Sequence, residues 1–380
     1  MTQAASLDPA SLDPASLDPD VAQRAIEYCY EQGWSDGLPL VPATRPLVDQ
    51  FLAHTSRDPG EVIGTLEQVG SGCTIYLAAV NAAMAGCRPE YFPVVLAAFG
   101  ALMAERAARG GGWQSTSGPA PLIVVNGPVR ADLGFNATGG VFGPGFRANA
   151  TVARAIGLIV RNAFGIHPHV LEQATQGIPG RWSICIAENE EESPWEPFSV
   201  GGGVPAGTSA VSATLLRTSE FVDNRHSHHP EDVLWDLADT ISRTGAQIFK
   251  EASAGVVLCP EHAQMFAGAG YSRAAVQEWL MARCGRLPAD LRRAGKGDLS
   301  TISPKDEARQ ATAGAGEISR TMMSSRQLPV VVAGARNAAI SMVVRIFGEW
   351  SGTAVPVEVP AEVPADVTAG APAEAGTGTR

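Results

Sequence analysis

Three short apolar runs, each bounded by proline or glycine, constrain the fold of this chain most strongly. They are PLIVVNG (121–127), AGVVLCP (254–260) and LPVVVAG (328–334). Runs of this length and composition predict buried β-strands. The second run leads into EHAQMFAGAG and the third into ARNAAISMVVRIF (335–347), and both of these segments are predicted to be helices. The alternation of strand, turn and helix predicts an α/β fold.

Further elements follow from composition and turn signals. Stretches rich in alanine and leucine predict helices; proline is tolerated in the first turn of a helix, and glycine ends one. Stretches that alternate apolar and polar residues predict strands. The predicted helices span 21–32, 74–85, 93–108 and 147–165, and the additional predicted strands span 181–188 and 209–216.

The length of 380 residues exceeds what one compact core usually holds, so we expect two α/β lobes with short buried strands. The glycine-rich stretch 200–207 separates an N-terminal lobe, 21–203, from a C-terminal lobe, 208–352. Within the second lobe, the polar stretch 287–327 is predicted to be a mobile segment with short helices.

Both ends of the chain are predicted to be disordered tails. Residues 1–20 repeat Ala-Ser-Leu-Asp-Pro three times, and residues 353–380 are rich in proline, alanine, glutamate and glycine. Regularly spaced prolines exclude a long helix, and neither segment has enough apolar residues to offset the entropy of ordering. We therefore expect both tails to be dispensable for stability.

Charge and cysteine spacing narrow the class of protein. The net charge of −11 and an isoelectric point near 5.2 argue against nucleic acid and anionic membranes as partners. The first 20 residues lack the basic and apolar regions of a secretory signal, and no apolar run approaches the ~18 residues of a spanning helix. Six widely spaced cysteines without a C-x-x-C motif predict reduced thiols in the cytoplasm.

Two cysteines are candidate catalytic residues. Cys73 follows Gly-Ser-Gly at the expected start of the helix 74–85, where free amides and the helix dipole would lower the pKa of the thiol. Cys87 follows the same helix, with Arg88 beside it as a cation and candidate substrate-binding residue. The alternative is that both thiols pack in the core, because cysteine is among the most buried residue types.

The segment GGVFGPGFRANATVARA (139–155) is a candidate anion-binding loop. Gly143 and Gly145 let the backbone approach a ligand, and Arg147 can clamp a carboxylate or phosphate with two N–H groups. Asn149 is expected to cap the following helix, whose first amides would face the anion. The alternative is an ordinary glycine-rich loop before a helix.

The acidic segment CIAENEEESPWEPF (185–198) supplies a candidate proton-transfer group. Glu188 closes an apolar strand, and we expect it to act as a general acid or base. Asn189 beside it, and Asn126 at the end of the strand 121–127, are candidate substrate-binding residues. The other acidic residues of the segment are more typical of a solvated surface.

Histidines offer a metal-binding alternative. His226, His228 and His229 lie in the segment NRHSHHPED, and His262 follows the strand 254–260. Their spacing does not match an H-E-x-x-H motif, so a polar loop is the favoured interpretation. No metal and no other cofactor is predicted.

Five longer sequence words resemble a bacterial family associated with UGSC-type (seleno)proteins, which are named for a redox-active selenocysteine or cysteine motif. The words are GWSDGLPLVP (33–42), AVNAAMAGCRPEYFPVVLAA (79–98), VNGPVRADLGFNA (125–137), FGPGFRANATVARAIGLIVRN (142–162) and CIAENEEESPWEPF (185–198). The resemblance favours Cys87 over Cys73, because the word around Cys87 is typical of the family. The chain has no Cys-Gly-Ser-Cys motif.

Together these features predict a cytoplasmic enzyme that uses a cysteine thiol on a small anionic organic molecule, in a lyase, transferase or thiol redox reaction. One alternative is a metal-dependent lyase or hydrolase that uses the four histidines. Another is a non-catalytic partner subunit of a redox protein. In either case the expected protein partner is a second copy of the chain or the product of a neighbouring gene.

Overall fold

The computed structural model describes residues 19–178, 184–246, 253–296, 318–320, 322 and 324–358. Residues 1–18 and 359–380 of the two predicted tails lie outside these ranges, as does the larger part of the predicted mobile segment 287–327. None of the helices in the described ranges is both long and apolar enough to span a bilayer.

Helices and strands alternate along the described chain, which confirms the predicted α/β class. The α-helices are α1 Pro19–Glu31, α2 Arg45–Leu52, α3 Ile75–Ala85, α4 Phe92–Ala104, α5 Arg106–Arg109, α6 Val129–Asp132, α7 Arg147–Asn162, α8 Phe198–Gly201, α9 Pro230–Ser242, α10 Pro260–Gly268, α11 Arg273–Arg283 and α12 Pro288–Arg293. The strands are β1 Val62–Leu66, β2 Ser71–Thr74, β3 Ala120–Asn126, β4 Cys185–Ala187, β5 Ala210–Asp223, β6 Ser253–Leu258, β7 Gly285–Arg286, β8 Ser319–Arg320, β9 Val330–Val332, β10 Ile340–Ile346 and β11 Ala354–Pro356.

Strands from both halves of the chain form one mixed, seven-stranded sheet. Its order is β4-β3-β5-β10-β6-β9, and β11 pairs with β5. In the first trio of strands, β3 pairs with β4 in parallel and with β5 in antiparallel orientation. In the second trio, β6 pairs with β9 in parallel and with β10 in antiparallel orientation. Because β5 and β10 are antiparallel to each other, the two trios have the connectivity of an approximate two-fold rotation. The two predicted lobes therefore share a single sheet across the stretch 200–207.

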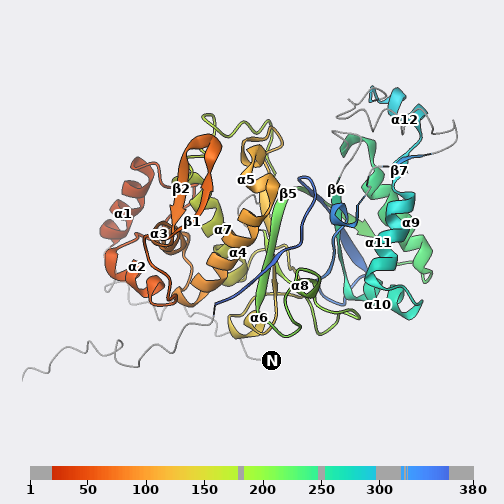
Figure 1. The fold of residues 1–380 in the computed structure, drawn as a ribbon, viewed down its shortest axis with the longest axis horizontal. Coiled ribbons are helices and arrows are strands. Elements are labelled where there is room, and N and C mark those ends of the chain that lie inside the picture. The colour runs from red at the N-terminus through yellow and green to blue at the C-terminus, as the bar shows by residue number, and fades with distance from the viewer. Residues whose placement is uncertain are drawn as a thin grey trace, which may run out of the picture.

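The N-terminal helices cover one face of β4, β3 and the first part of β5 (Figure 1). Ile123 and Val125 of β3 pack in a core with α3, α4 and α7. Leu122 and Val124 point to the opposite face and join a second core that includes Trp350. Side chains alternate between the faces of a strand, so burial on both faces explains the continuous apolar run of β3.

The C-terminal helices α9, α10 and α11 cover the other trio of strands (Figure 1). Val256 and Leu258 of β6 pack with these helices, whereas Val257 belongs to the same second core as Val124 of β3. Two helical layers thus cover separate parts of the sheet, and the second core joins both trios on its other face.

The sheet curls until the ends of its two edge strands meet. The amide of Asn189, just after β4, donates to the carbonyl of Val332 at the end of β9 over 2.8 Å. The amide of Gly334, just after β9, donates to the carbonyl of Ala137 over 2.8 Å. The carboxyl ends of β4 and β9 therefore lie together, and α/β sheets bind ligands at the carboxyl ends of their strands.

One predicted helix is a strand. The segment 335–347 contains β10, which lies between β5 and β6 and pairs with both. Its isoleucines and valines are stiff at χ1 and fit a pleated surface. Pairing on both sides outweighs the helical signal of the alanines that precede Ile340. The strand predicted at 209–216 is confirmed as the first half of β5.

The predicted C-terminal tail begins too early. Residues 354–356 form β11, which pairs with β5 from Ser212 to Ala210. The amide of Val357 also donates to the carbonyl of Ser209 over 2.8 Å, and Thr55 donates to Glu358 over 3.0 Å. Residues 353–358 are therefore part of the fold, although their composition resembles that of a tail.

Removing residues 353–358 should destabilise the protein, in contrast to removing 359–380 alone. The loss of β11 and its hydrogen bonds should lower the free energy of unfolding by about 2–4 kcal/mol. Urea unfolding of chains that end at residue 352 and at residue 358 measures the difference. Equal stability of these two chains would show that β11 contributes nothing to the sheet.

Candidate active site

Glu188 lies directly after β4 with its side chain completely buried. Its Oε2 atom accepts hydrogen bonds from Asn126 Nδ2 over 2.5 Å and from the amide of Phe198 over 2.6 Å. Its Oε1 atom accepts from Arg273 Nη2 over 3.0 Å. Donors from the end of β3, the start of α8 and the start of α11 thus converge on one carboxylate.

Burial and hydrogen bonding act in opposite directions on the pKa of Glu188. Removal from water raises the pKa of the carboxyl group, because the charged form loses its hydration. The charge of Arg273 and the bonds from Phe198 and Asn126 lower the pKa, but burial prevails. Burial also lowers the pKa of the Arg273 guanidinium. Both partners are shifted toward their neutral forms, which is common at functional sites.

Acidification should therefore favour the folded protein through Glu188. A carboxyl with a raised pKa takes up its proton first in the folded state, so its contribution to stability falls as the pH rises from the ordinary pKa of 4.5 through the raised value. Wild type should gain stability relative to Glu188→Gln as the pH falls from about 7 to about 5. Urea unfolding at each pH measures this difference. A relative loss would mean that the Arg273 charge outweighs burial.

Arg130 fixes the two loops that carry this site. Its buried side chain donates to the carbonyls of Gly127 and Glu188 over 3.0 and 2.7 Å. It also pairs with Glu190 over 3.0 Å and with Glu191 over 2.9 Å. Glu190 in turn accepts the amide of Gly127 over 2.7 Å. The turn after β3 and the segment after β4 are thus held together by one guanidinium.

Arg273 is the member of the carboxylate–arginine pair that solvent reaches. Its side chain is 19% exposed, whereas that of Glu188 is 0% exposed. The guanidinium carbon lies 5.9 Å from the ring centre of Trp195, and Trp195 donates to the carbonyl of Tyr271 over 3.2 Å. Arg336, further out, is half exposed and pairs with an acidic side chain after β4 over 2.8 Å. Arg273 is therefore the cation of the pair that a molecule arriving from solvent could reach.

The two asparagines predicted to bind substrate have different surroundings. Asn126 Nδ2 donates to Glu188 over 2.5 Å and to Glu190 over 2.9 Å, so Asn126 belongs to the carboxylate site. Asn189 Nδ2 donates to the carbonyl of Gly334 over 3.0 Å. Asn189 therefore joins the ends of β4 and β9 with both its backbone and its side chain.

The predicted anion-binding loop lies beside Cys87. α7 begins at Arg147, whose exposed side chain donates through Nε to the carbonyl of Gly86 over 2.9 Å. Gly143 and Gly145 are exposed in the loop before it. The structure thus brings Arg147 next to the residue that precedes Cys87. The predicted anion-binding loop and the predicted thiol therefore lie close together, although they are distant in the sequence.

Asn149 is not the predicted helix cap. The cap position is Phe146, which makes no side-chain cap bond. Asn149 is buried inside the first turn, and its Oδ1 atom accepts the amide of Asn136 over 2.8 Å. Its Nδ2 atom donates to the carbonyls of Asn136 and Cys185 over 3.1 and 2.9 Å. The side chain therefore ties α7 to β4 and is not turned toward a ligand.

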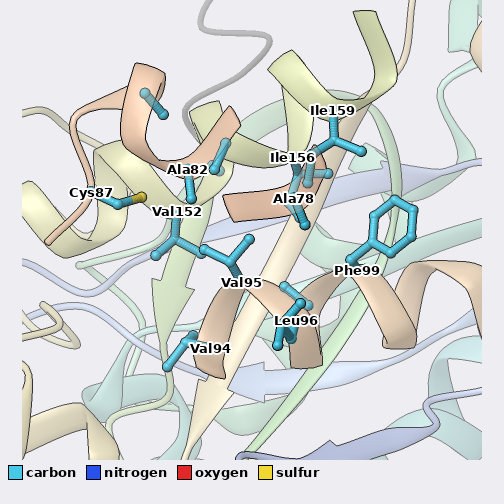
Figure 2. Packing of buried hydrophobic residues seen from close by; sticks show 14 of the residues in the cluster. Ala78, Ala82, Cys87, Val94, Val95, Leu96, Phe99, Val152, Ile156 and Ile159 are labelled. Carbon is cyan, nitrogen blue, oxygen red and sulfur yellow. The ribbon is translucent and has the colours of Figure 1, made fainter. Parts of the chain in front are cut away.

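Cys87 lies in the apolar core between α3, α4 and α7 (Figure 2). Its side chain is directed toward Val152 and is buried among aliphatic neighbours. Burial raises the pKa of Cys87 to about 12, although Thr151 and Arg147 act to lower it. Arg88, predicted to bind substrate beside this thiol, has an exposed side chain.

Cys73 is not in the first turn of a helix. It belongs to β2, and α3 begins at Ile75 with the side chain of Thr74 as its cap, accepting the amide of Leu77 over 3.2 Å. Burial raises the pKa of Cys73 to about 12. The expectation that helix amides lower this pKa is wrong, because the thiol is completely buried and loses the hydration of its charged form.

The histidines do not converge. Three of them are exposed in the loop between β5 and α9, namely His226, His228 and His229. His262 of α10 is buried, with Nδ1 2.8 Å from Ser341 Oγ and Nε2 3.2 Å from the carbonyl of Asn224. Across the described ranges, no three His, Cys, Asp or Glu side chains are grouped closely enough to hold a metal ion.

Arg130 and Arg273 were not among the residues predicted from the sequence. Arg273 is separated from Glu188 by 85 positions, and nothing local to it indicates a partner. The one available signal is physical: a carboxylate that closes a buried strand needs a cation or several donors. Arg130 lies in the word 125–137, four positions after Asn126.

The fold and site define an α/β protein with a buried carboxylate–arginine pair where the ends of two edge strands meet. No protein-family model matches the chain, and no curated protein and no solved structure matches it. The resemblance to UGSC-type proteins stays a prediction.

Proposed function

We propose that this protein is an enzyme that acts on a small anionic organic molecule, with Glu188 as the group that transfers a proton. The observation that carries the proposal is a completely buried carboxyl group, bonded to Arg273 and to two other donors, at the carboxyl end of a strand. Ligands of α/β sheets bind at such strand ends.

The raised pKa of Glu188 suits this role. General acids and bases work best when their pKa lies near the working pH, and burial moves the carboxyl in that direction. A buried ion pair is also a poor way to stabilise a fold, because apolar side chains of similar volume are often as good or better. The presence of the Glu188–Arg273 pair in the interior is therefore better explained by chemistry than by stability.

Arg273 supplies the charge that would attract an anion. Its guanidinium is partly open to solvent and is largely removed from water by Trp195 and the surrounding loops. A weakly hydrated guanidinium binds carboxylates strongly, because it loses little hydration on contact. The predicted use of a cysteine thiol has less support, since the best candidate, Cys87, lies in an apolar core.

Metabolite consumption tests the proposal. Cells that lack the gene should accumulate the substrate, and purified protein should consume it. Glu188→Gln should slow consumption by about 10²–10⁴-fold, the usual contribution of a general acid or base. Glu188→Asp, which keeps the charge but shortens the side chain, gives a second variant if Glu188→Gln folds poorly.

Two variants serve as controls for this experiment. Cys87→Ser removes the thiol that the sequence favoured, and Arg336→Lys changes an exposed cation that does not touch Glu188. Both should consume the accumulated compound at close to the wild-type rate. A folded Glu188→Gln protein with wild-type activity, or an inactive but folded Cys87→Ser protein, would overturn the assignment of Glu188.

A further inference from the structure

Two polar atoms beside Glu188 are buried and have no hydrogen-bond partner among the described residues. They are Arg273 Nε, a donor, and Asn126 Oδ1, an acceptor. Asn126 is completely buried. Such atoms are uncommon in folded proteins, and each one calls for an explanation. Here one donor and one acceptor belong to the two side chains that hold the same carboxylate.

The orientation of the Asn126 amide is fixed by its neighbours. Its Nδ2 atom faces Glu188 Oε2 at 2.5 Å and Glu190 Oε1 at 2.9 Å. Rotation of the amide by half a turn would put Oδ1 against two carboxylate oxygens, which can only accept hydrogen bonds. Oδ1 must therefore point away from both carboxylates, and it remains an acceptor that needs a donor.

The guanidinium of Arg273 is used on one side only. Its Nη2 atom donates to Glu188 Oε1 over 3.0 Å, while Nε is left without an acceptor. Arginine binds carboxylates with two parallel N–H groups. The unused Nε–H of Arg273 can therefore donate one of the two hydrogen bonds of such a bidentate contact. Trp195 lies over the guanidinium, with 5.9 Å between its ring centre and the guanidinium carbon.

We propose that this site takes a small carboxylate that carries a hydrogen-bond donor, a hydroxyl or an amine, on the carbon next to the carboxylate. The carboxylate accepts from Arg273, and the neighbouring donor is bound by Asn126 Oδ1. Glu188 is hydrogen-bonded to both of these side chains. This inference rests on the proposed function, because it names the substrate class of the same site.

Three acids with the same carbon skeleton test this inference on the full chain: lactate, alanine and propionate. Titration followed by NMR gives the dissociation constant of each. Lactate or alanine should bind roughly tenfold or more tightly than propionate, because propionate leaves Asn126 Oδ1 without its donor. Preference for lactate identifies a hydroxyl as the donor, and preference for alanine identifies an amine. Equal binding of all three acids, or no binding, would overturn the inference.

A pair of variants locates the binding. Arg273→Lys keeps the charge near Glu188 but removes Nε, so it should weaken the preferred acid about tenfold. Arg336→Lys changes an exposed arginine nearby and should leave binding unchanged. If the two variants bind alike, the acid is held elsewhere and the inference fails. The consumption assay for Glu188 does not use these acids, so its outcome stays separate from this one.

Discussion

Replacing Arg273 alone by methionine should lower the free energy of unfolding by about 3–5 kcal/mol, the cost of breaking a buried ion pair from one side. Methionine fills a similar volume but cannot donate to Glu188 Oε1. The carboxylate then stays completely buried with only the donors from Asn126 and Phe198. Urea unfolding followed by circular dichroism measures the loss.

A double-mutant cycle shows whether the loss comes from the pair. Glu188→Gln combined with Arg273→Met removes both charges, so the double variant should be more stable than the Arg273→Met protein. Arg336→Met provides the surface control, because this half-exposed pair should contribute no more than about 1 kcal/mol. If Arg273→Met costs as little as Arg336→Met, the contact between Arg273 and Glu188 contributes no more to stability than an exposed ion pair does.

The fold class could be predicted because the strands are apolar on both faces. β3, β6 and β9 each contain an unbroken apolar run that lies close to proline or glycine in the sequence, and every residue of the three strands is buried. β10 was mistaken for a helix because the alanines before it favour helix, and only pairing with β5 and β6 decides the outcome. β11 was missed for a related reason, since three residues of strand in a proline-rich segment carry no local signal.

Chain length suggested two separate lobes, but strands from both predicted lobes belong to one sheet. The stretch 200–207 does connect two trios of strands with their own helical layers, as the composition suggested. Composition cannot show that β5 pairs on one side with β3 and on the other with β10. That pairing is non-local and depends on the register of side chains from distant segments.

Part of the site could be read from strand ends. Glu188 directly follows β4, and Asn126 is the last residue of β3. The two strands are parallel neighbours, so their carboxyl ends lie together. In the structure, Asn126 Nδ2 donates to Glu188 Oε2 over 2.5 Å. Arg273 could not be found in this way, because it reaches the site only through the curl of the sheet, which brings the end of β9 and the start of α11 to β4.

The pKa of Cys73 is set by burial and not by its position near a helix start. Proximity to a helix terminus shifts a pKa by the field of a few amides, whereas complete burial removes the hydration of the thiolate, which is the larger effect. A helix start is visible in the sequence, but the burial of Cys73 depends on residues that pack around it in the fold. Local position alone therefore gave the wrong direction for the pKa.

Alkylation of the cysteines should be very slow in the folded protein. All six cysteines are buried, and burial raises the pKa of each thiol. At neutral pH, a thiol with a pKa of about 12, such as Cys87, holds roughly a thousandfold less thiolate than one at the ordinary value of 9.0. Iodoacetamide labelling followed by mass spectrometry should find Cys87 unmodified until the protein is unfolded.

Glu90→Cys supplies the matched control, because residue 90 is exposed and lies three positions from Cys87. Its new thiol should react at the rate of a free cysteine, while Cys87 in the same protein does not. If Cys87 reacts as fast as this control, the core between α3 and α7 opens on the timescale of labelling, and thiol chemistry becomes the stronger proposal. If Cys87 stays protected, a reaction in the folded protein has to use another group, and Glu188 is the side chain whose pKa and contacts suit that task.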